Sequence, residues 1–232
     1  MSIYRDLENL DIDVQQAMSR VLANWYMSKS FRYENDFFDW DTGATEWTVT
    51  ENAATGTQSI EDAAGGVLAL LTDDEITDSI DVQKIGEAFK LTTGKPLYFE
   101  SRFAVNCTDI DNPTVVVGLC ITDTDLTGGM SDGVYFIKDN GNANLDFVAE
   151  KDSAETEKAD TGVDLVDNTF VTVGFYFDGS GNVTPYINGT AGTSQSTDVP
   201  DDEELCVSFA MLNGEAAANT LRIDYVKVVQ NR

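Results

Sequence analysis

The sequence predicts an all-β sandwich of two antiparallel sheets, preceded by an amphipathic α-helix. Three observations lead there: short segments alternate apolar and polar residues, Gly, Asn and Asp separate these segments, and only the first residues repeat apolar side chains every three or four positions. Alternation is the pattern of a half-buried strand, and the longer spacing is that of a helix. Many short strands at regular intervals are typical of a sandwich or barrel. We therefore expect a helical arm at residues 1–30 and one sandwich domain at residues 31–232.

The helical arm is expected to be a contact surface. Asp13, followed three residues later by Gln16, resembles a capping box that starts or restarts a helix at Val14. The helix either packs back on its own sandwich or docks on a neighbouring subunit, and the apolar spacing, which approaches a heptad, fits docking slightly better. The residues expected to bind a partner are Ile3, Tyr4, Leu7, Leu10, Val14, Met18, Val21 and Trp25.

The strands of the sandwich are predicted in order along the chain. Segments 37–40 and 47–50 open the β region, and the further candidates are 66–71, 96–105, 114–121, 134–137, 145–148, 170–177, 183–189, 205–211 and 221–228. Segment 96–105 alternates, whereas 114–121 is continuously apolar, as in a central strand. Asn140-Gly141 is a two-residue hairpin signal. The apolar phase slips by one residue between Ile223 and Val226, which predicts a β-bulge.

Charge restricts the partners that the chain can bind. Lys and Arg number 14 against 41 Asp and Glu, histidine is absent, and the formal net charge is -27. Such a surface repels phosphate backbones and anionic membrane surfaces, so we expect neither nucleic acid nor membrane as a partner. The first residues lack the apolar run of a secretory signal. Cys107, Cys120 and Cys206 are odd in number and widely spaced, which predicts free thiols in a chain made in the cytoplasm.

Several longer phrases carry a family resemblance. They are GVLAL at 66–70, FKLTTGKPLYFESRF at 89–103, TVGFYFDG at 172–179, PYING at 185–189 and LRIDYVKV at 221–228. Together they resemble the concanavalin A-like lectin/glucanase superfamily, including its laminin-G-like members. The resemblance covers residues 37–228 and implies a jelly-roll sandwich. Because the motifs are degenerate, the resemblance implies the fold more strongly than a function.

Catalytic groups are few in the sequence. Without histidine, Ser-His-Asp and Cys-His catalysis and histidine-ligated metal sites are excluded. Enzymes of the resembling superfamily use carboxylates on one strand, and the nearest match is NLDFVAE at 144–150. Asp146 and Glu150 would share a face, but four strand residues span about 13 Å. Paired catalytic carboxyls are separated by roughly 5–9.5 Å, and Asn144 stands where a first Glu is wanted. We therefore expect no enzyme activity.

Sugar binding without catalysis is a second possibility for the sandwich. It would use aromatic faces and Asp or Asn side chains in the loops at one edge, and the candidates are Asp123, Asp125, Asp132, Tyr135, Asn140, Tyr186 and Asn188. Some members of the resembling superfamily also bind calcium among such oxygens. Segment 139–144 superficially resembles a calcium loop. It lacks the spacing of an EF-hand, and a plain hairpin explains it. No cofactor or metal is expected.

The acidic charge and the N-terminal helix together resemble bacteriophage structural proteins. This resemblance implies a non-enzymatic virion protein, a capsid decoration protein on the outer capsid surface that is made in the host cytoplasm. Its partners would be the major capsid protein or copies of itself, bound through the N-terminal segment. The alternative is a carbohydrate-binding, lectin-like module that adheres to surface glycans, in a head or tail fibre.

Overall fold

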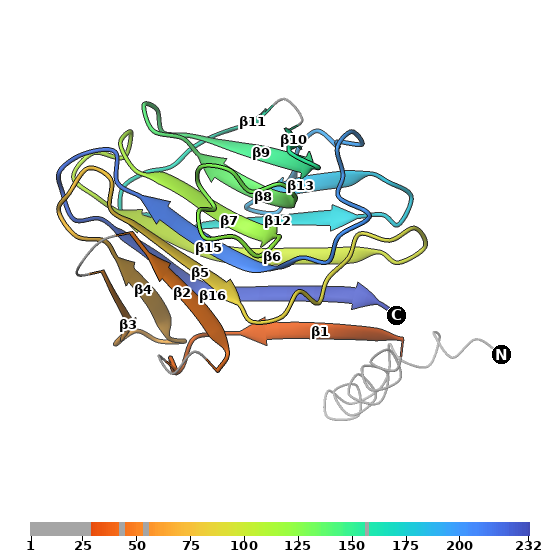
Figure 1. Ribbon diagram of the computed structural model, residues 1–232, viewed down its shortest axis with the longest axis horizontal. Helices are drawn as coiled ribbons and strands as arrows, with labels where there is room; N and C mark the ends of the chain where they lie inside the picture. The colour runs from red at the N-terminus through yellow and green to blue at the C-terminus, as the bar shows by residue number, and fades with distance from the viewer. Residues whose placement is uncertain (1–28, 42–44, 53–55, 156–157) are drawn as a thin grey trace, which may run out of the picture.

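The computed structural model describes residues 29–41, 45–52, 56–155 and 158–232, and every regular element in these ranges is a β-strand. The strands form two eight-stranded antiparallel sheets, and Figure 1 shows those of sheet B in front of those of sheet A. The predicted sandwich is thereby confirmed. The predicted N-terminal helix and its eight partner-binding residues lie outside the described residues, so they stay a prediction.

Sheet A is built around the last strand of the chain. Its order is β14-β13-β12-β6-β16-β4-β3, and β1 also pairs with β16. The strands are β1 (Ser30–Asn35), β3 (Thr57–Glu61), β4 (Val67–Leu71), β6 (Leu97–Asn106), β12 (Val171–Phe177), β13 (Val183–Ile187), β14 (Thr190–Ala191) and β16 (Thr220–Asn231). Strand β16 runs beside β1 near the C-terminus, as Figure 1 shows.

Sheet B carries the most deeply buried strands. Its order is β10-β9-β8-β7-β15-β5-β2, and β11 also pairs with β9. The strands are β2 (Trp47–Glu51), β5 (Ser79–Lys84), β7 (Thr114–Cys120), β8 (Gly133–Lys138), β9 (Asn144–Lys151), β10 (Ala154–Glu155), β11 (Ala159–Asp164) and β15 (Cys206–Leu212). Every residue of β7 and β8 is buried, so both faces of these strands are covered.

The hydrophobic core lies between the two sheets. Phe99 and Phe175 of sheet A stack with ring centroids 5.0 Å apart, and Phe175 reaches Phe147 of sheet B at 6.1 Å. Phe136 continues the contact at 5.0 Å from Phe147. Because large aromatic side chains bury much apolar area, this interlayer cluster is a main source of the sandwich's stability.

Most predicted strands are observed, and two details are confirmed. The register of β16 shifts between Ile223 and Tyr225, at the predicted bulge, and the hairpin predicted at Asn140-Gly141 joins β8 and β9, through a connection of residues 139–143 in place of a two-residue turn. The predicted strand at 37–40 is wrong. Phe37 has a left-handed backbone (φ 49°), and its N–H is bonded to Asn35 Oδ1 at 2.7 Å, so the chain turns there. Phe37 is buried and Phe38 is exposed, and the same alternation of buried and exposed residues is found in a strand.

Candidate functional site

The outer face of sheet B is covered by the segment that joins β7 and β8, here called the β7–β8 loop (residues 121–132). Leu126 and Met130 of this loop are buried against outward side chains of the sheet, namely Val116, Cys120, Tyr135, Ile137, Val148 and Ala210. A second, smaller apolar cluster therefore lies outside the main core. This cover explains why β7 is apolar on both faces.

Two polar side chains of β5 anchor the β7–β8 loop. Asp81 accepts the Leu126 N–H at 3.0 Å. Gln83 accepts the Asp123 N–H at 2.9 Å and donates to the Ile121 carbonyl at 2.9 Å. Burial raises the pKa of Asp81 to about 7; the Leu126 N–H opposes this rise, and the nearby carboxylates of the loop add to it. The loop is thus attached to the sheet at three backbone positions.

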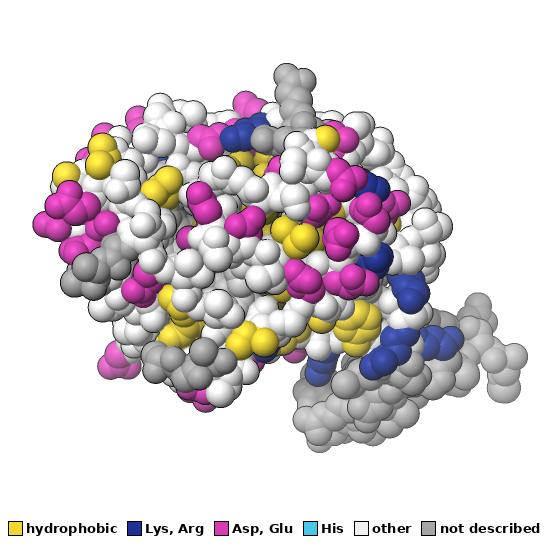
Figure 2. All heavy atoms as spheres, in the orientation of Figure 1, with side chains coloured by type: hydrophobic (Ala, Val, Ile, Leu, Met, Phe, Trp, Pro, Cys, Tyr) yellow, Lys and Arg dark blue, Asp and Glu magenta, His cyan; other side chains and the backbone are white. Residues whose placement is uncertain are grey.

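A pocket of about 230 Å³ opens between the β7–β8 loop and strands β8 and β9. Its lining consists of Leu126, Thr127, Gly128, Gly129, Met130, Tyr135, Ile137, Asp139, Glu150 and Lys158. Carboxylates are spread over this side of the molecule with apolar side chains between them, as Figure 2 shows. A mixed lining with a few fixed polar groups is typical of a small-ligand site.

The polar groups of the pocket are held in place by one another. The Tyr135 hydroxyl donates to Glu150 Oε2 at 2.9 Å. Lys158 and Asp139, which also line the pocket, form an ion pair at 2.5 Å. The pocket therefore offers a phenol, two carboxylates and an ammonium group around apolar walls. Such a set can bind hydroxyl groups as donor and as acceptor.

Strand β8 reaches this position because its neighbour carries a glycine. Gly118 of β7 lies opposite Tyr135 in the register, and a Cβ at Gly118 would lie 2.5 Å from Tyr135 Cα and 2.5 Å from the Val134 carbonyl oxygen. We expect Gly118→Ala to lower the free energy of unfolding by about 1–3 kcal/mol, because the two strands must move apart. Urea unfolding followed by circular dichroism measures this change. Gly141→Ala has open space but a positive φ of 104°, so it separates backbone strain from the steric effect at Gly118.

The two carboxylates considered for catalysis lie on the outer face of β9. Leu145 and Phe147 point into the core and Val148 points outward, so Asp146 and Glu150 share the outward face with Val148. Burial raises the pKa of Asp146, and the carboxylates of Asp160 and Asp139 add to the rise. The strand spacing still separates Asp146 from Glu150 by about 13 Å. Only Glu150 of this pair lines the pocket.

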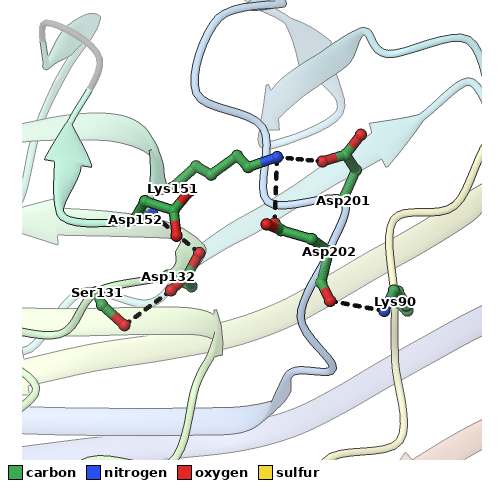
Figure 3. Close-up of polar contacts among 7 residues, drawn as sticks. All are labelled: Lys90, Ser131, Asp132, Lys151, Asp152, Asp201 and Asp202. Atoms are coloured by element: carbon green, nitrogen blue, oxygen red, sulfur yellow. Dashed lines mark hydrogen bonds and ion pairs between the residues drawn. The ribbon is translucent and has the colours of Figure 1, made fainter.

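One of the predicted sugar-binding residues lines the pocket, a second lies beside a lining residue, and a third is buried just before β8. Tyr135 lines the pocket. Asp125 lies beside the lining residue Gly128, since a Cβ on Gly128 would meet Asp125 Oδ2 at 2.5 Å. Asp132 is buried and accepts from the Ser131 hydroxyl at 2.7 Å and from the Asp152 N–H at 3.1 Å. Figure 3 shows these contacts of Asp132 beside the ion pairs of Lys151 with Asp201 and Asp202. Asp132 thus holds the end of β9 in place.

The remaining predicted sugar-binding residues lie elsewhere. Asp123 folds back on its own loop, where it accepts the Thr124 N–H at 2.6 Å. Asn140 lies in the β8–β9 turn, and its N–H donates to the Thr114 hydroxyl at 3.2 Å. Tyr186 lies on β13 of sheet A, and Asn188 lies in the turn after this strand, where its side chain accepts the Thr172 N–H at 3.0 Å. The seven candidates therefore do not form one site.

Sequence reasoning missed most of the pocket lining. Asp139, Glu150 and Lys158 lie at an end of β8, on β9 and before β11, and the register of three strands brings them together. Gly128-Gly129 was the available signal, since paired glycines in a loop let the backbone approach a ligand closely.

Within the described ranges, no three His, Cys, Asp or Glu residues converge as metal ligands, and no helix is long and apolar enough to cross a membrane. The three cysteines are free thiols, as predicted. Cys120 and Cys206 are buried, and burial raises the pKa of both thiols.

Comparison with known proteins gives matches in structure alone. No family model matches the chain, and no curated protein sequence matches it. An endo-1,3-beta-glucanase from Streptomyces sioyaensis is similar over 88% of this chain and 97% of its own, at 10% identity and a TM-score of 0.64. A protein of unknown function from Shewanella oneidensis MR-1 covers 88% and 87%, at 20% identity and 0.60. A carbohydrate esterase from the Shiga toxin-encoding bacteriophage phi24B covers 87% and 98%, at 16% identity and 0.56.

These matches correct the main functional interpretation. The expected non-enzymatic capsid decoration protein is contradicted, because the similar structures are named mostly as glucanases and other carbohydrate-acting enzymes, beside a carbohydrate recognition domain. The expectation of no enzyme activity is contradicted by the same names. Its physical basis was too narrow, since it considered histidine chemistry and one pair of carboxylates on a single strand, and left open carboxylates that come from different strands. The alternative, carbohydrate binding, is the better supported interpretation. The chain has the concanavalin A-like jelly-roll fold that these glucanases and lectins share.

Proposed function

We propose that this chain is a carbohydrate-active domain that binds a saccharide in the pocket between the β7–β8 loop and strands β8 and β9. The observation that carries the proposal is the Tyr135–Glu150 pair in the pocket lining, where a phenol and a carboxylate are held 2.9 Å apart beside apolar side chains. Sugars present hydroxyl groups around apolar C–H faces, so they match such a lining. The fold shared with glucanases supports the same class of ligand.

The roles of the pocket groups follow from their chemistry. Glu150 accepts hydrogen bonds from sugar hydroxyls, and Tyr135 fixes the orientation of that carboxylate. Gly128 and Gly129 have no side chain, so a sugar ring can approach their backbone closely. The Lys158–Asp139 ion pair adds an ammonium group and a second carboxylate to the lining. A pocket of about 230 Å³ has room for a small saccharide unit rather than for a long chain.

The test compares binding by isosteric variants. Glu150→Gln keeps the side-chain shape and removes its charge, so we expect affinity for the saccharide to fall roughly tenfold or more, as for the loss of a hydrogen bond to a charged group. Binding is measured by affinity electrophoresis against β-1,3- and β-1,3-1,4-glucans, mannan, xylan and galactan. Reducing-sugar release in the same samples measures any cleavage.

The matched control is Glu75→Gln, a variant of an exposed carboxyl in the turn before β5. It is expected to bind like the wild type. Tyr135→Phe, which removes one hydroxyl, is expected to weaken binding less than Glu150→Gln. Unchanged affinity in Glu150→Gln, or no retardation of the wild type by any polysaccharide, would contradict the proposal.

A further inference from the structure

The outer face of sheet A carries half of the chain's tyrosines. Of eight tyrosines, four lie on this face, namely Tyr98 of β6, Tyr176 of β12, Tyr186 of β13 and Tyr225 of β16. Their chain neighbours Phe99, Phe175, Ile187 and Val226 belong to the buried core, so the tyrosines point outward. Tyr98 and Tyr176 lie directly opposite each other on neighbouring strands. We call these four residues the tyrosine face.

One carboxylate holds two of these rings in place. The Tyr98 hydroxyl donates to Glu100 Oε2 at 2.5 Å, and the Tyr225 hydroxyl donates to Glu100 Oε1 at 2.9 Å. Lys227 lies 3.5 Å from Glu100 Oε1 and 4.2 Å from the centre of the Tyr225 ring. Rings that are fixed before binding lose little conformational entropy when a ligand is bound.

A glycine lies among the rings of the tyrosine face. Gly174 of β12 lies between Glu100 and Tyr186 in the register of three adjacent strands. A Cβ at Gly174 would lie 2.7 Å from the Phe99 carbonyl oxygen and 3.5 Å from the Tyr98 hydroxyl oxygen. The position thus excludes a side chain, and the glycine lets the Tyr98 hydroxyl lie close to the β12 backbone.

Charges on this face are paired, in contrast to the chain as a whole. Lys227 pairs with Glu100, Arg102 with Asp224, and Arg32 with Glu34. The chain carries a formal net charge of -27. A face with balanced charge attracts neither cationic nor anionic partners at a distance, so its chemistry fits an uncharged ligand.

We propose that the tyrosine face binds an uncharged polysaccharide chain, at a second site on the opposite side of the sandwich from the pocket. Aromatic rings pack against the C–H faces of sugar rings, because the negative face of the ring attracts weakly positive C–H groups. The Glu100 and tyrosine oxygens lie beside these rings and bond to sugar hydroxyls. Strands are spaced by about 4.8 Å, so four strands offer a platform several sugar units long.

The proposal stands independently of the pocket, and one experiment separates the two. In affinity electrophoresis against neutral polysaccharides, we expect the double variant Tyr176→Ala/Tyr186→Ala to bind at least about tenfold more weakly than the wild type. Tyr33→Phe, on β1 and facing the core, is the control and is expected to bind normally. A second readout is nitration by tetranitromethane, which a bound neutral glucan should slow at Tyr176, exposed at 39%.

Each outcome bears on one site. Loss of binding in the double variant with little effect of Glu150→Gln supports the tyrosine face and contradicts the pocket. Loss in Glu150→Gln alone, with normal binding and unprotected nitration at the tyrosines, overturns the tyrosine face. Retardation by charged polysaccharides only also overturns it. Circular dichroism of each variant shows whether it is folded, and Tyr98→Phe, which removes one hydroxyl, tests the same face without a cavity.

Discussion

Phe175→Ala should lower the free energy of unfolding by about 3–5 kcal/mol, among the largest effects of any single substitution in this chain. The Phe175 ring is fully buried, stacks on Phe99 at 5.0 Å and contacts Phe147 of the opposite sheet at 6.1 Å. Its removal leaves a cavity at the junction of the two layers, and the rigid sheets on both sides collapse poorly into it. Urea unfolding followed by tryptophan fluorescence and circular dichroism measures the change.

The control for this prediction is the next residue along the strand. Tyr176 points outward and is 39% exposed, so Tyr176→Ala is expected to change the free energy of unfolding far less than Phe175→Ala. A loss of less than about 1 kcal/mol in Phe175→Ala would mean that the interlayer aromatic cluster does not hold the sheets together.

Asp81→Asn should stabilise the protein at neutral pH and leave it nearly unchanged at pH 4. Burial raises the pKa of Asp81 to about 7, so the folded protein retains a proton that the unfolded chain releases near its ordinary value of 3.8. Stability therefore falls as the pH rises from about 4 to about 7, and the loss is constant above that range. Three pKa units correspond to roughly 4 kcal/mol at 1.36 kcal/mol per unit. The amide is uncharged at every pH and still accepts the Leu126 N–H.

The measurement is the difference in the free energy of unfolding between wild type and Asp81→Asn from pH 4 to pH 8. Subtraction cancels the titration of the other carboxylates, and Asp74→Asn, at an exposed position in the loop before β5, serves as the reference substitution. A difference that is flat with pH, or that grows toward low pH, would be inconsistent with a raised pKa at Asp81. Because Asp81 anchors the β7–β8 loop, the same pH range should alter the mobility of the pocket wall.

The sequence allowed the sandwich to be predicted because its strands alternate apolar and polar residues. Leu97, Phe99 and Phe103 of β6 face the core, and their alternation with polar residues is visible in the sequence alone. Edge strand β3, with the sequence TQSIE, was missed because such a strand buries few side chains. The strand predicted at 37–40 failed because a left-handed residue reverses the chain within an alternating pattern.

The candidate site was much less predictable. Tyr135 was predicted, but its partner Glu150 was considered only for catalysis with Asp146, since a single strand shows which residues share a face and not what lies opposite. The continuous apolar run of β7 indicated a covered strand without indicating what covers it. The cover is the β7–β8 loop, and its position depends on Leu126 and on bonds to Asp81 and Gln83 of a strand 40 residues earlier.

The position of β16 has a consequence for synthesis of the protein. This strand pairs with β1, β4 and β6, so it joins residues 30–35 to residues 226–231 at the middle of sheet A. The earlier strands of that layer therefore emerge from the ribosome without their common neighbour, and their apolar sides stay exposed until residues 220–231 are made. Closing such distant pairs is slow compared with forming local hairpins. Sheet A therefore reaches its full strand pairing only after translation passes β16.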